Sequence, residues 1–264
     1  MTTKNKNIYL TNMFNITPPS VSPKPYSRKY KRNLPHWEIA DAIYFVTYRL
    51  AHSVPLTVIR EIREEFKRQV KIESKVQANI DKKRLYKLRF EVILKIDNYL
   101  NNNLEIQYLA NPVISKIVLD SILHFAVLYH DNAVFFQKKS DVVIIDNSNY
   151  HSFTKEIHFI LYRWTIMPNH VHLLLRPLIN PQTGKYYVLY KILQSIKKYS
   201  GRQANRILNK KGQFWHYESY DHIIRNQKEF NWIWNYIDYN AVKAGLANSG
   251  KEWPAGSDYF FNHI

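Results

Sequence analysis

Thirteen residues, Trp164 to Arg176, constrain the fold of this chain more than any other stretch. They read W-T-I-M-P-N-H-V-H-L-L-L-R, two apolar runs separated by Pro168-Asn169. Proline favours the first central position of a turn and asparagine tolerates the second, so the stretch predicts a β-hairpin. Side chains alternate between the faces of a strand, which places His170 and His172 on one face. Two imidazoles on a rigid strand are a candidate pair of metal ligands, although H-x-H triplets also occur on ordinary exposed faces.

Charge and composition narrow the class of partner. The 264 residues carry a formal net charge of +17, with a pI near 9.7, and such a field attracts phosphate polymers or anionic membranes. Nucleic acid is favoured because the basic residues are mixed with tyrosines and asparagines, and no apolar run approaches the roughly 18 residues of a membrane span. Residues 1–17 lack the apolar stretch of a signal peptide. The absence of cysteine excludes disulfides, thiolate metal sites and a cysteine nucleophile. We therefore expect a cytoplasmic protein that faces nucleic acid.

The chain is predicted to consist of an arm, one domain and a tail. Residues 1–34 contain seven Lys or Arg, no acid and four prolines, which is typical of a flexible basic arm. Within it, Arg28, Lys29 and Arg32 are candidate phosphate contacts, with a solvated tail as an equal alternative. Residues 35–254 are predicted to form a single domain, and residues 255–264 a C-terminal tail.

The order of predicted elements indicates the fold class. A β-branched and aromatic strand precedes a helical insertion at about 56–130, the hairpin follows, and a basic helix, a strand and a last helix complete the chain. This order predicts an α+β fold with a ferredoxin-like antiparallel sheet and packed helices. In the helix over 82–100, Leu85, Leu88, Val92 and Ile96 predict the apolar face, and the charged residues are interpreted as a solvated surface. No chemical role is indicated for residues 82–109. The predicted elements are strand 43–51, helices from 55, over 82–100 and from 112 to near 130, strand 156–167, strand 170–176, helix 187–209, strand 219–225 and helix 228–244.

The basic helix at 187–209 is a candidate nucleic-acid contact. Eight cations and no acid lie between Lys185 and Lys211. A solvated helix face usually mixes both signs, so phosphate binding is favoured over simple solvation. The candidate contacts are Lys191, Lys198, Arg202 and Arg206.

The last helix and the strand before it carry further candidates. Tyr236 and Asn240 are spaced i and i+4, so they share a helix face and are able to meet one ligand together. By spacing alone, Tyr236 is more readily interpreted as one of many packing tyrosines. Asp221 and His222 on the preceding strand are candidates for lining a site, and a satisfied core histidine is an equal interpretation of His222.

Several stretches together resemble one family. They are L-P-H-W-E at 34–38, Y-F-V-T-Y-R-L-A at 44–51, M-P-N-H-V-H at 167–172, F-W-H at 214–216, Y-D-H-I-I-R at 220–225 and N-Y-I-D-Y-N-A-V-K-A-G-L at 235–246. In this order, over residues 34–254, they resemble the single-tyrosine HUH transposases, and closest among these the REP-associated tyrosine transposases. The chain departs from the family pattern at Asn240-Ala241, where the family usually has Asn-Pro; alanine continues the helix at this point, and the ligand itself is retained.

The resemblance implies a mechanism and a partner. His170 and His172 would hold a divalent cation, Mg²⁺ or Mn²⁺, with Asn240 as a third ligand. Tyr236 would attack phosphorus in single-stranded DNA, at or near a hairpin, giving a 5′-phosphotyrosine and a free 3′-OH. The resemblance further implies a bacterial-type protein associated with the nucleoid and favours a monomer over a homodimer. The alternatives are a catalytically inactive or domesticated nucleic-acid-binding protein of the same fold, and a metal-dependent nuclease that uses water.

Overall fold

The predicted hairpin lies at the centre of the sheet in the computed structural model, which describes residues 27–31, 35–76, 82–130, 133–138, 141–144, 156–180 and 182–263. Its strands are β7 (Phe159–Ile166) and β8 (His170–Pro177), paired antiparallel with Thr165 opposite His172. The Met167 amide donates to the His170 carbonyl at 2.9 Å across the Pro168-Asn169 turn. The hairpin prediction is confirmed.

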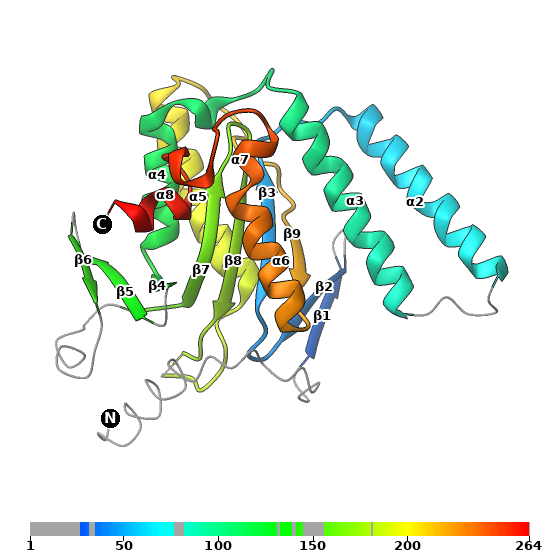
Figure 1. The fold of residues 1–264 in the computed structure, drawn as a ribbon, viewed down its shortest axis with the longest axis horizontal. Helices are drawn as coiled ribbons and strands as arrows, with labels where there is room; N and C mark the ends of the chain where they lie inside the picture. The colour runs from blue at the N-terminus through cyan, green and yellow to red at the C-terminus, as the bar shows by residue number, and fades with distance from the viewer. Residues whose placement is uncertain are drawn as a thin grey trace.

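The main sheet has the strand order β6-β5-β4-β7-β8-β3-β9 (Figure 1). Its pairs are antiparallel apart from β4 and β7, which run parallel. The α+β fold class is therefore confirmed, with one parallel pair in a sheet predicted to be antiparallel. The remaining strands of this sheet are β3 (Tyr44–Arg49), β4 (Ala126–His130), β5 (Ala133–Lys138), β6 (Asp141–Ile144) and β9 (Tyr220–Ile223).

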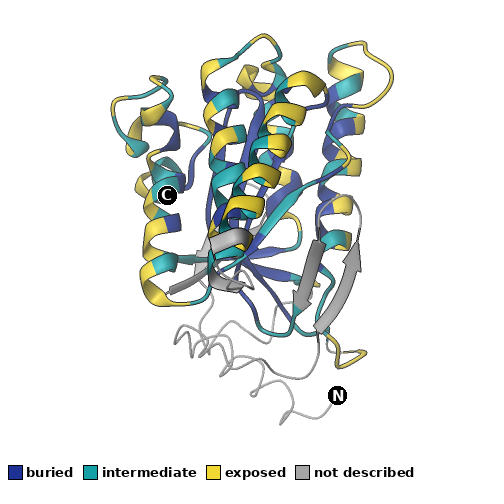
Figure 2. Cartoon of the chain, turned by 90° about the vertical axis from the view of Figure 1, so that its right-hand side faces the viewer, coloured by how far each residue is buried: buried dark blue, intermediate teal, exposed yellow. Residues whose placement is uncertain are grey.

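Helices cover both faces of the sheet because its central strands are apolar on both sides. One face packs on α4 (Pro112–Leu123) and α5 (Leu189–Ile207), and the other on α6 (Gln227–Asp238). Figure 2 shows the result as buried strands between helices whose outer surfaces are exposed. Val46 and Leu173 face α5, whereas Phe45, Leu174 and their neighbours face α6. His170 and His172 share the α6 face because they alternate with Leu173.

The helical insertion differs from its prediction at one end. Asn111 caps α4 as expected, because its side chain accepts from the Val113 and Ile114 amides, but the helix ends at Leu123 and not near His130. Residues 126–130 form strand β4. Their A-V-L-Y-H sequence suits a buried strand, and pairing with β7 satisfies its backbone groups.

The insertion begins with two long antiparallel helices, α2 (Leu56–Val76) and α3 (Lys82–Asn102), which we call the α2–α3 hairpin. In Figure 1 it extends beside the sheet on the side of α6. Phe90 of α3 lies against Phe45, His222 and Trp232 at centroid distances of 6.4, 4.5 and 5.5 Å. A short 3₁₀ turn, η1 (Tyr108–Ala110), connects the hairpin to α4.

Regular structure occurs near both ends of the described chain. Within the predicted arm, β1 (Ser27–Lys31) pairs antiparallel with β2 (Pro35–Ile39), and residues 1–26 and 32–34 lie outside the described residues. In the predicted tail, α8 (Ser257–Asn262) packs on β7. The Trp164 backbone amide donates to Ser257 Oγ at 3.2 Å, and Ser257 Oγ donates to the Trp164 carbonyl at 3.0 Å.

The last predicted helix is interrupted once. After α6, Tyr239 separates a short helix, α7 (Asn240–Lys243), and Gly245 at φ 70° ends it in the left-handed region that glycine tolerates. A second 3₁₀ turn, η3 (Gly250–Glu252), leads to α8. Among the described residues, no helix has both the length and the apolar character needed to cross a membrane.

Candidate active site

The two histidines of β8 are fixed by neighbours on three elements. Both side chains are fully buried. Asn169 Nδ2 donates to the carbonyls of Leu100 and Asn103 at 2.9 and 3.0 Å, which leaves its Oδ1 to accept from His170 Nδ1 at 2.7 Å. His170 Nδ1 therefore donates to Asn169, and this contact turns the ring so that Nε2 faces inward. Thr47 Oγ1 contacts His172 Nδ1 at 2.8 Å, so this ring also turns Nε2 inward.

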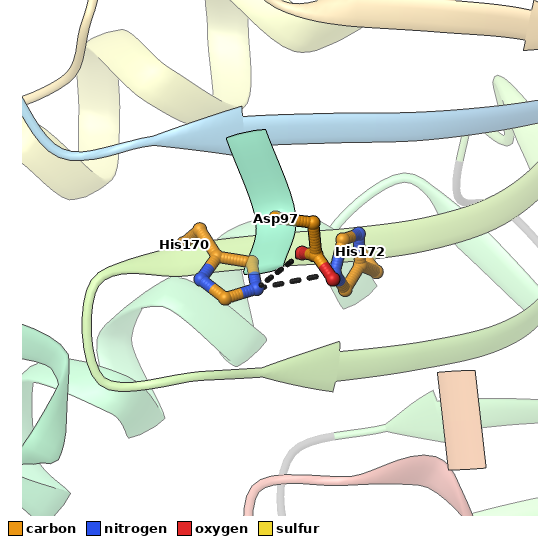
Figure 3. A group of neighbouring side chains, drawn as sticks. All are labelled: Asp97, His170 and His172. Atoms are coloured by element: carbon orange, nitrogen blue, oxygen red, sulfur yellow. Dashed lines mark hydrogen bonds and ion pairs between the residues drawn. The ribbon is translucent and has the colours of Figure 1, made fainter. Parts of the chain in front are cut away.

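A carboxylate from α3 completes the group. Asp97 Oδ1 lies 2.8 Å from His172 Nε2 and 3.0 Å from His170 Nε2, and the two Nε2 atoms are 3.1 Å apart (Figure 3). Burial by itself raises the pKa of Asp97, but the charges and hydrogen bonds of His172 and His170 outweigh it and hold that pKa well below its usual range. Burial lowers the pKa of His170. A carboxylate beside a neutral imidazole is the protonation state that binds cations.

The spacing of these three atoms fits a bound cation. Ligands at right angles around an ion held at about 2.1 Å are about 3 Å apart, which is the spacing of Asp97 Oδ1 and the two Nε2 atoms. Asn240 lies beside the group with its Nδ2 3.2 Å from His172 Nε2, and its buried Oδ1 has no hydrogen-bond partner among the described residues. A turn of this amide would present the oxygen to a cation. Asp97, His170 and His172 are therefore a buried group that can bind a metal.

Tyr236 reaches the same carboxylate from α6. Its hydroxyl donates to Asp97 Oδ2, and Asn240 Nδ2 lies 3.3 Å from that oxygen. The Tyr236 ring packs against His172 and Phe45, with centroids 5.7 and 5.9 Å away. Burial, and next the Asp97 charge, raise the pKa of Tyr236 far above its ordinary value. The structure therefore brings together all four predicted residues, His170, His172, Tyr236 and Asn240, whereas Tyr239 is 63% exposed and outside the group.

The residues predicted on β9 separate to opposite faces. His222 pairs in register with Phe45 and so shares the histidine face, while Asp221 pairs with Val46 and faces the α5 side. His222 Nε2 contacts Glu229 Oε1 of α6 at 2.8 Å, and its ring lies 4.5 Å from Phe90. These contacts tie β9 to α6 and α3 and account for the burial of His222 without a ligand.

The predicted phosphate contacts gather only in part. Lys198 and Arg202 line a groove of about 600 Å³ between α5 and residues 212–219, which we call the α5 groove. Lys191 and Arg206 are exposed on α5 but do not line it. Of the N-terminal candidates, Arg28 and Lys29 lie in β1, opposite Glu38 and Trp37, and Arg32 lies outside the described residues. Aromatic residues of the α5 groove are Tyr190, Phe214, Trp215 and Tyr217.

Asp97 is the site residue that the sequence analysis missed. The predicted apolar face of its helix was Leu85, Leu88, Val92 and Ile96, with the charged residues in solvent. Leu88 is buried as predicted, but the other buried residues are not those of that face and include Ile93, Asp97 and Leu100, spaced i, i+4 and i+7. An acid in an apolar stripe at helical spacing is the signal that could have identified it.

Comparisons with known proteins give a curated relative and a solved structure. No family model matches the chain. A Haemophilus influenzae protein provisionally named a REP-associated tyrosine transposase is 30% identical over 96 residues, which are 35% of this chain and 54% of the relative, so the match spans about half of that protein's length. A solved REP-associated tyrosine transposase bound to a REP hairpin aligns over 88% of this chain and 84% of its own, at 14% identity and a TM-score of 0.44. The resemblance indicated by the motifs is thereby confirmed, and the chain is similar in sequence to the REP-associated tyrosine transposases.

Proposed function

We propose that this protein is a metal-dependent tyrosine transposase of the HUH type, which cleaves and joins single-stranded DNA at or near hairpins. One observation carries the proposal: the Tyr236 hydroxyl, both imidazoles and Asn240 all contact a single buried carboxylate, Asp97. A tyrosine that only packs in the core does not require polar and ionisable neighbours of this kind. A nucleophile does require them, because it must lie beside the group that activates its target.

The proposed reaction is a transesterification. The Tyr236 hydroxyl gives up its proton as its oxygen forms a bond to phosphorus. The bond from phosphorus to the 3′ oxygen breaks, and that oxygen takes up one proton as a free 3′-OH, so the step is balanced. The product is a 5′-phosphotyrosine, which retains the energy of the phosphodiester for rejoining. A divalent cation, Mg²⁺ or Mn²⁺, would polarise the scissile phosphate and offset the negative charge that raises the pKa of Tyr236. Asp97 orients the tyrosine hydroxyl, and Phe45 positions its ring.

The metal part of the proposal is tested by binding alone. His170, His172 and Asp97 would hold the cation, with Asn240 Oδ1 available as a further ligand. Calorimetric titration with Mn²⁺ should show a single site whose affinity falls at least tenfold in Asp97→Asn and in His172→Ala. Asp120→Asn, an exposed acid of α4, is the matched control. Unchanged affinity in both site variants would contradict the assignment.

Hairpin DNA is the proposed partner, bound by a monomer. The α5 groove, with Lys198 and Arg202 beside aromatic rings, suits a phosphate backbone and unpaired bases. The matched relative is named as a transposase, which supports the same class of substrate. We further propose residues 35–254, together with α8, as the folded domain, and residues 1–34 as an additional DNA contact through Arg28, Lys29 and Arg32.

The test is a search for a covalent product. The protein is incubated with Mn²⁺ and single-stranded hairpin DNA from the sequence flanking its own gene, followed by denaturing electrophoresis. We expect a slow-migrating adduct in wild type and in Tyr239→Phe, and none in Tyr236→Phe or His170→Ala. Cleavage that survives Tyr236→Phe without an adduct would favour the nuclease that uses water, and binding without cleavage would favour the inactive binding protein.

A further inference from the structure

One face of α6 and α7 carries a stripe that the proposed chemistry leaves unexplained. Trp232, Tyr236, Tyr239 and Lys243 are spaced i, i+4, i+7 and i+11, so their side chains follow one side of the helix. Trp232 is 45% exposed although it is the largest side chain type, and Tyr239 is 63% exposed. Two exposed aromatic rings and a lysine thus accompany the candidate nucleophile along its own helix.

Two members of this stripe contact Tyr236 from opposite directions along the helix. The Trp232 ring stacks on the Tyr236 ring at 5.3 Å with 21° between the planes. Lys243 Nζ lies 5.9 Å from the centroid of the same ring. An aromatic ring and a cation therefore flank the candidate nucleophile. A DNA strand could place a flat base on the first and a negative phosphate beside the second.

A groove opens at the Lys243 end of the stripe. It has a volume of about 680 Å³, and residues of α2 and α3 with Asn103 line it together with Lys243. In Figure 1, α3 and α6 lie side by side, in agreement with the Tyr236 to Asp97 contact. The polar side chains that α3 contributes are Lys95, Asn98, Tyr99, Asn102 and one acid, Glu91. The amides and the ammonium groups suit bases and phosphates without selecting a sequence.

We propose that the unpaired strand carrying the scissile phosphate lies along α6 and α7, with a base stacked on Trp232 and a phosphate beside Lys243, and continues into the groove walled by the α2–α3 hairpin. This inference rests on the proposed function, since it places the substrate of Tyr236. The strand must be single, because both faces of a base in a duplex are covered by its neighbours and cannot stack on a protein ring.

The experiment measures strand binding without chemistry. The full chain carrying Tyr236→Phe is titrated, by fluorescence anisotropy, into a labelled single-stranded oligonucleotide from the flanking sequence. Adding Trp232→Ala should weaken binding about tenfold, and Trp232→Phe should restore most of the loss. Adding Lys243→Ala should weaken binding and reduce the slope of log affinity against log salt by about 0.7. Binding of a blunt duplex should be unchanged in all three.

Controls separate this proposal from the chemistry. Tyr199→Ala removes a ring that is 56% exposed on α5, on the opposite face of the sheet, and should leave single-strand binding intact. Melting temperature and Mn²⁺ affinity check that each variant is folded. Trp232→Ala and Lys243→Ala that bind the strand as tightly as their parent would overturn the inference, even if wild type forms an adduct. The wild-type protein could also form no adduct and yet bind the strand in a way that depends on Trp232. That result would overturn the proposed function and support the proposed path of the strand.

Discussion

At the scale of single residues, the site depends on side chains that hold its two histidines in place. Of the two histidines, Thr47 contacts His172 through its Nδ1, and Asn169 contacts His170 through its Nδ1. Partners of this kind fix ring orientation and tautomer, and their loss typically costs 10–100-fold in metal affinity. Both lie in the motifs that carry the family resemblance, Y-F-V-T-Y-R-L-A and M-P-N-H-V-H. Their presence in these motifs has a physical reason. Without these partners the imidazole rings could rotate, and a rotated ring would no longer direct its Nε2 at a cation.

Thr47→Val should therefore weaken Mn²⁺ binding by roughly 10–100-fold, since the isosteric side chain leaves the His172 ring without its partner. Thr165→Val is a close control, because Thr165 is buried opposite His172 in the sheet and contacts Met167 Sδ instead of an imidazole. Calorimetry on both variants, with melting curves, provides the comparison. Equal losses in the two variants would show that packing, and not ring orientation, matters.

The residue scale also shows what a sequence can predict of such a site. The H-x-H pair and the i, i+4 pair of Tyr236 and Asn240 follow from the periods of strand and helix, so both could be placed on faces in advance. Asp97 was missed because two stripes of α3 share Leu88, and the rotation of the helix about its axis decides which of them is buried. Ile96 of the predicted stripe and Asp97 of the observed one are adjacent, about 100° apart around the helix. That rotation is set by distant parts of the chain, since the Phe90 ring contacts Phe45 and the Leu100 carbonyl accepts from Asn169.

At the scale of elements, β7, α6 and α8 meet at one buried ion pair. Arg163 of β7 lies 3.3 Å from Asp238 of α6 and 4.0 Å above the Trp234 ring, and Ser257 of α8 donates to Asp238 at 3.4 Å. Burial raises the pKa of Asp238 to about 7, opposed by Arg163 and increased by Asp258. The junction holds the helix that carries Tyr236 against the sheet.

The raised pKa of Asp238 predicts a pH dependence of stability. A carboxyl that binds its proton more tightly in the folded state contributes most below its unfolded pKa, near 3.8, and this contribution is lost as pH rises to about 7. The loss is of the order of 4 kcal/mol. Urea unfolding across this pH range should show that the free energy of unfolding of the wild type declines as pH rises. The decline should be flatter in Asp238→Asn and the same as wild type in Asp120→Asn. Parallel profiles for wild type and Asp238→Asn would contradict the assignment.

Elements differ in how far the sequence predicts them. Asn111-Pro112 marked the start of α4 correctly, because capping is a local interaction. Its end was placed too late, near His130, because β4 is recognisable only through its pairing with β7, more than 30 residues further along the chain. The same long-range pairing makes one pair of this sheet parallel. Local signals thus fixed element starts and turns, whereas strand partners depended on tertiary contacts.

At the scale of the whole molecule, a net charge of +17 should dominate DNA affinity. Affinity for hairpin DNA should fall steeply with salt, and Lys198→Ala or Arg202→Ala should each reduce the slope of log affinity against log salt by about 0.9 for a duplex contact. Lys67→Ala, an exposed cation on α2, controls for net charge alone. Filter binding at a series of salt concentrations provides the slopes, and an equal reduction in Lys67→Ala would show a diffuse field and no specific groove.

The origin of Asp97 in the α2–α3 hairpin has a consequence for the timing of activity during synthesis. Asp97 and Tyr236 are 139 residues apart in sequence, and ribosomes add about 5–20 residues per second, so roughly 7 to 28 seconds separate their incorporation. Both histidines are present only once residue 172 has been added, 64 residues before Tyr236. For about 3 to 13 seconds the carboxylate and both imidazoles therefore exist in the nascent chain while the tyrosine does not. On the proposed chemistry, an unfinished chain can acquire its cation while it remains unable to cut DNA, and cleavage begins only after α6 has docked.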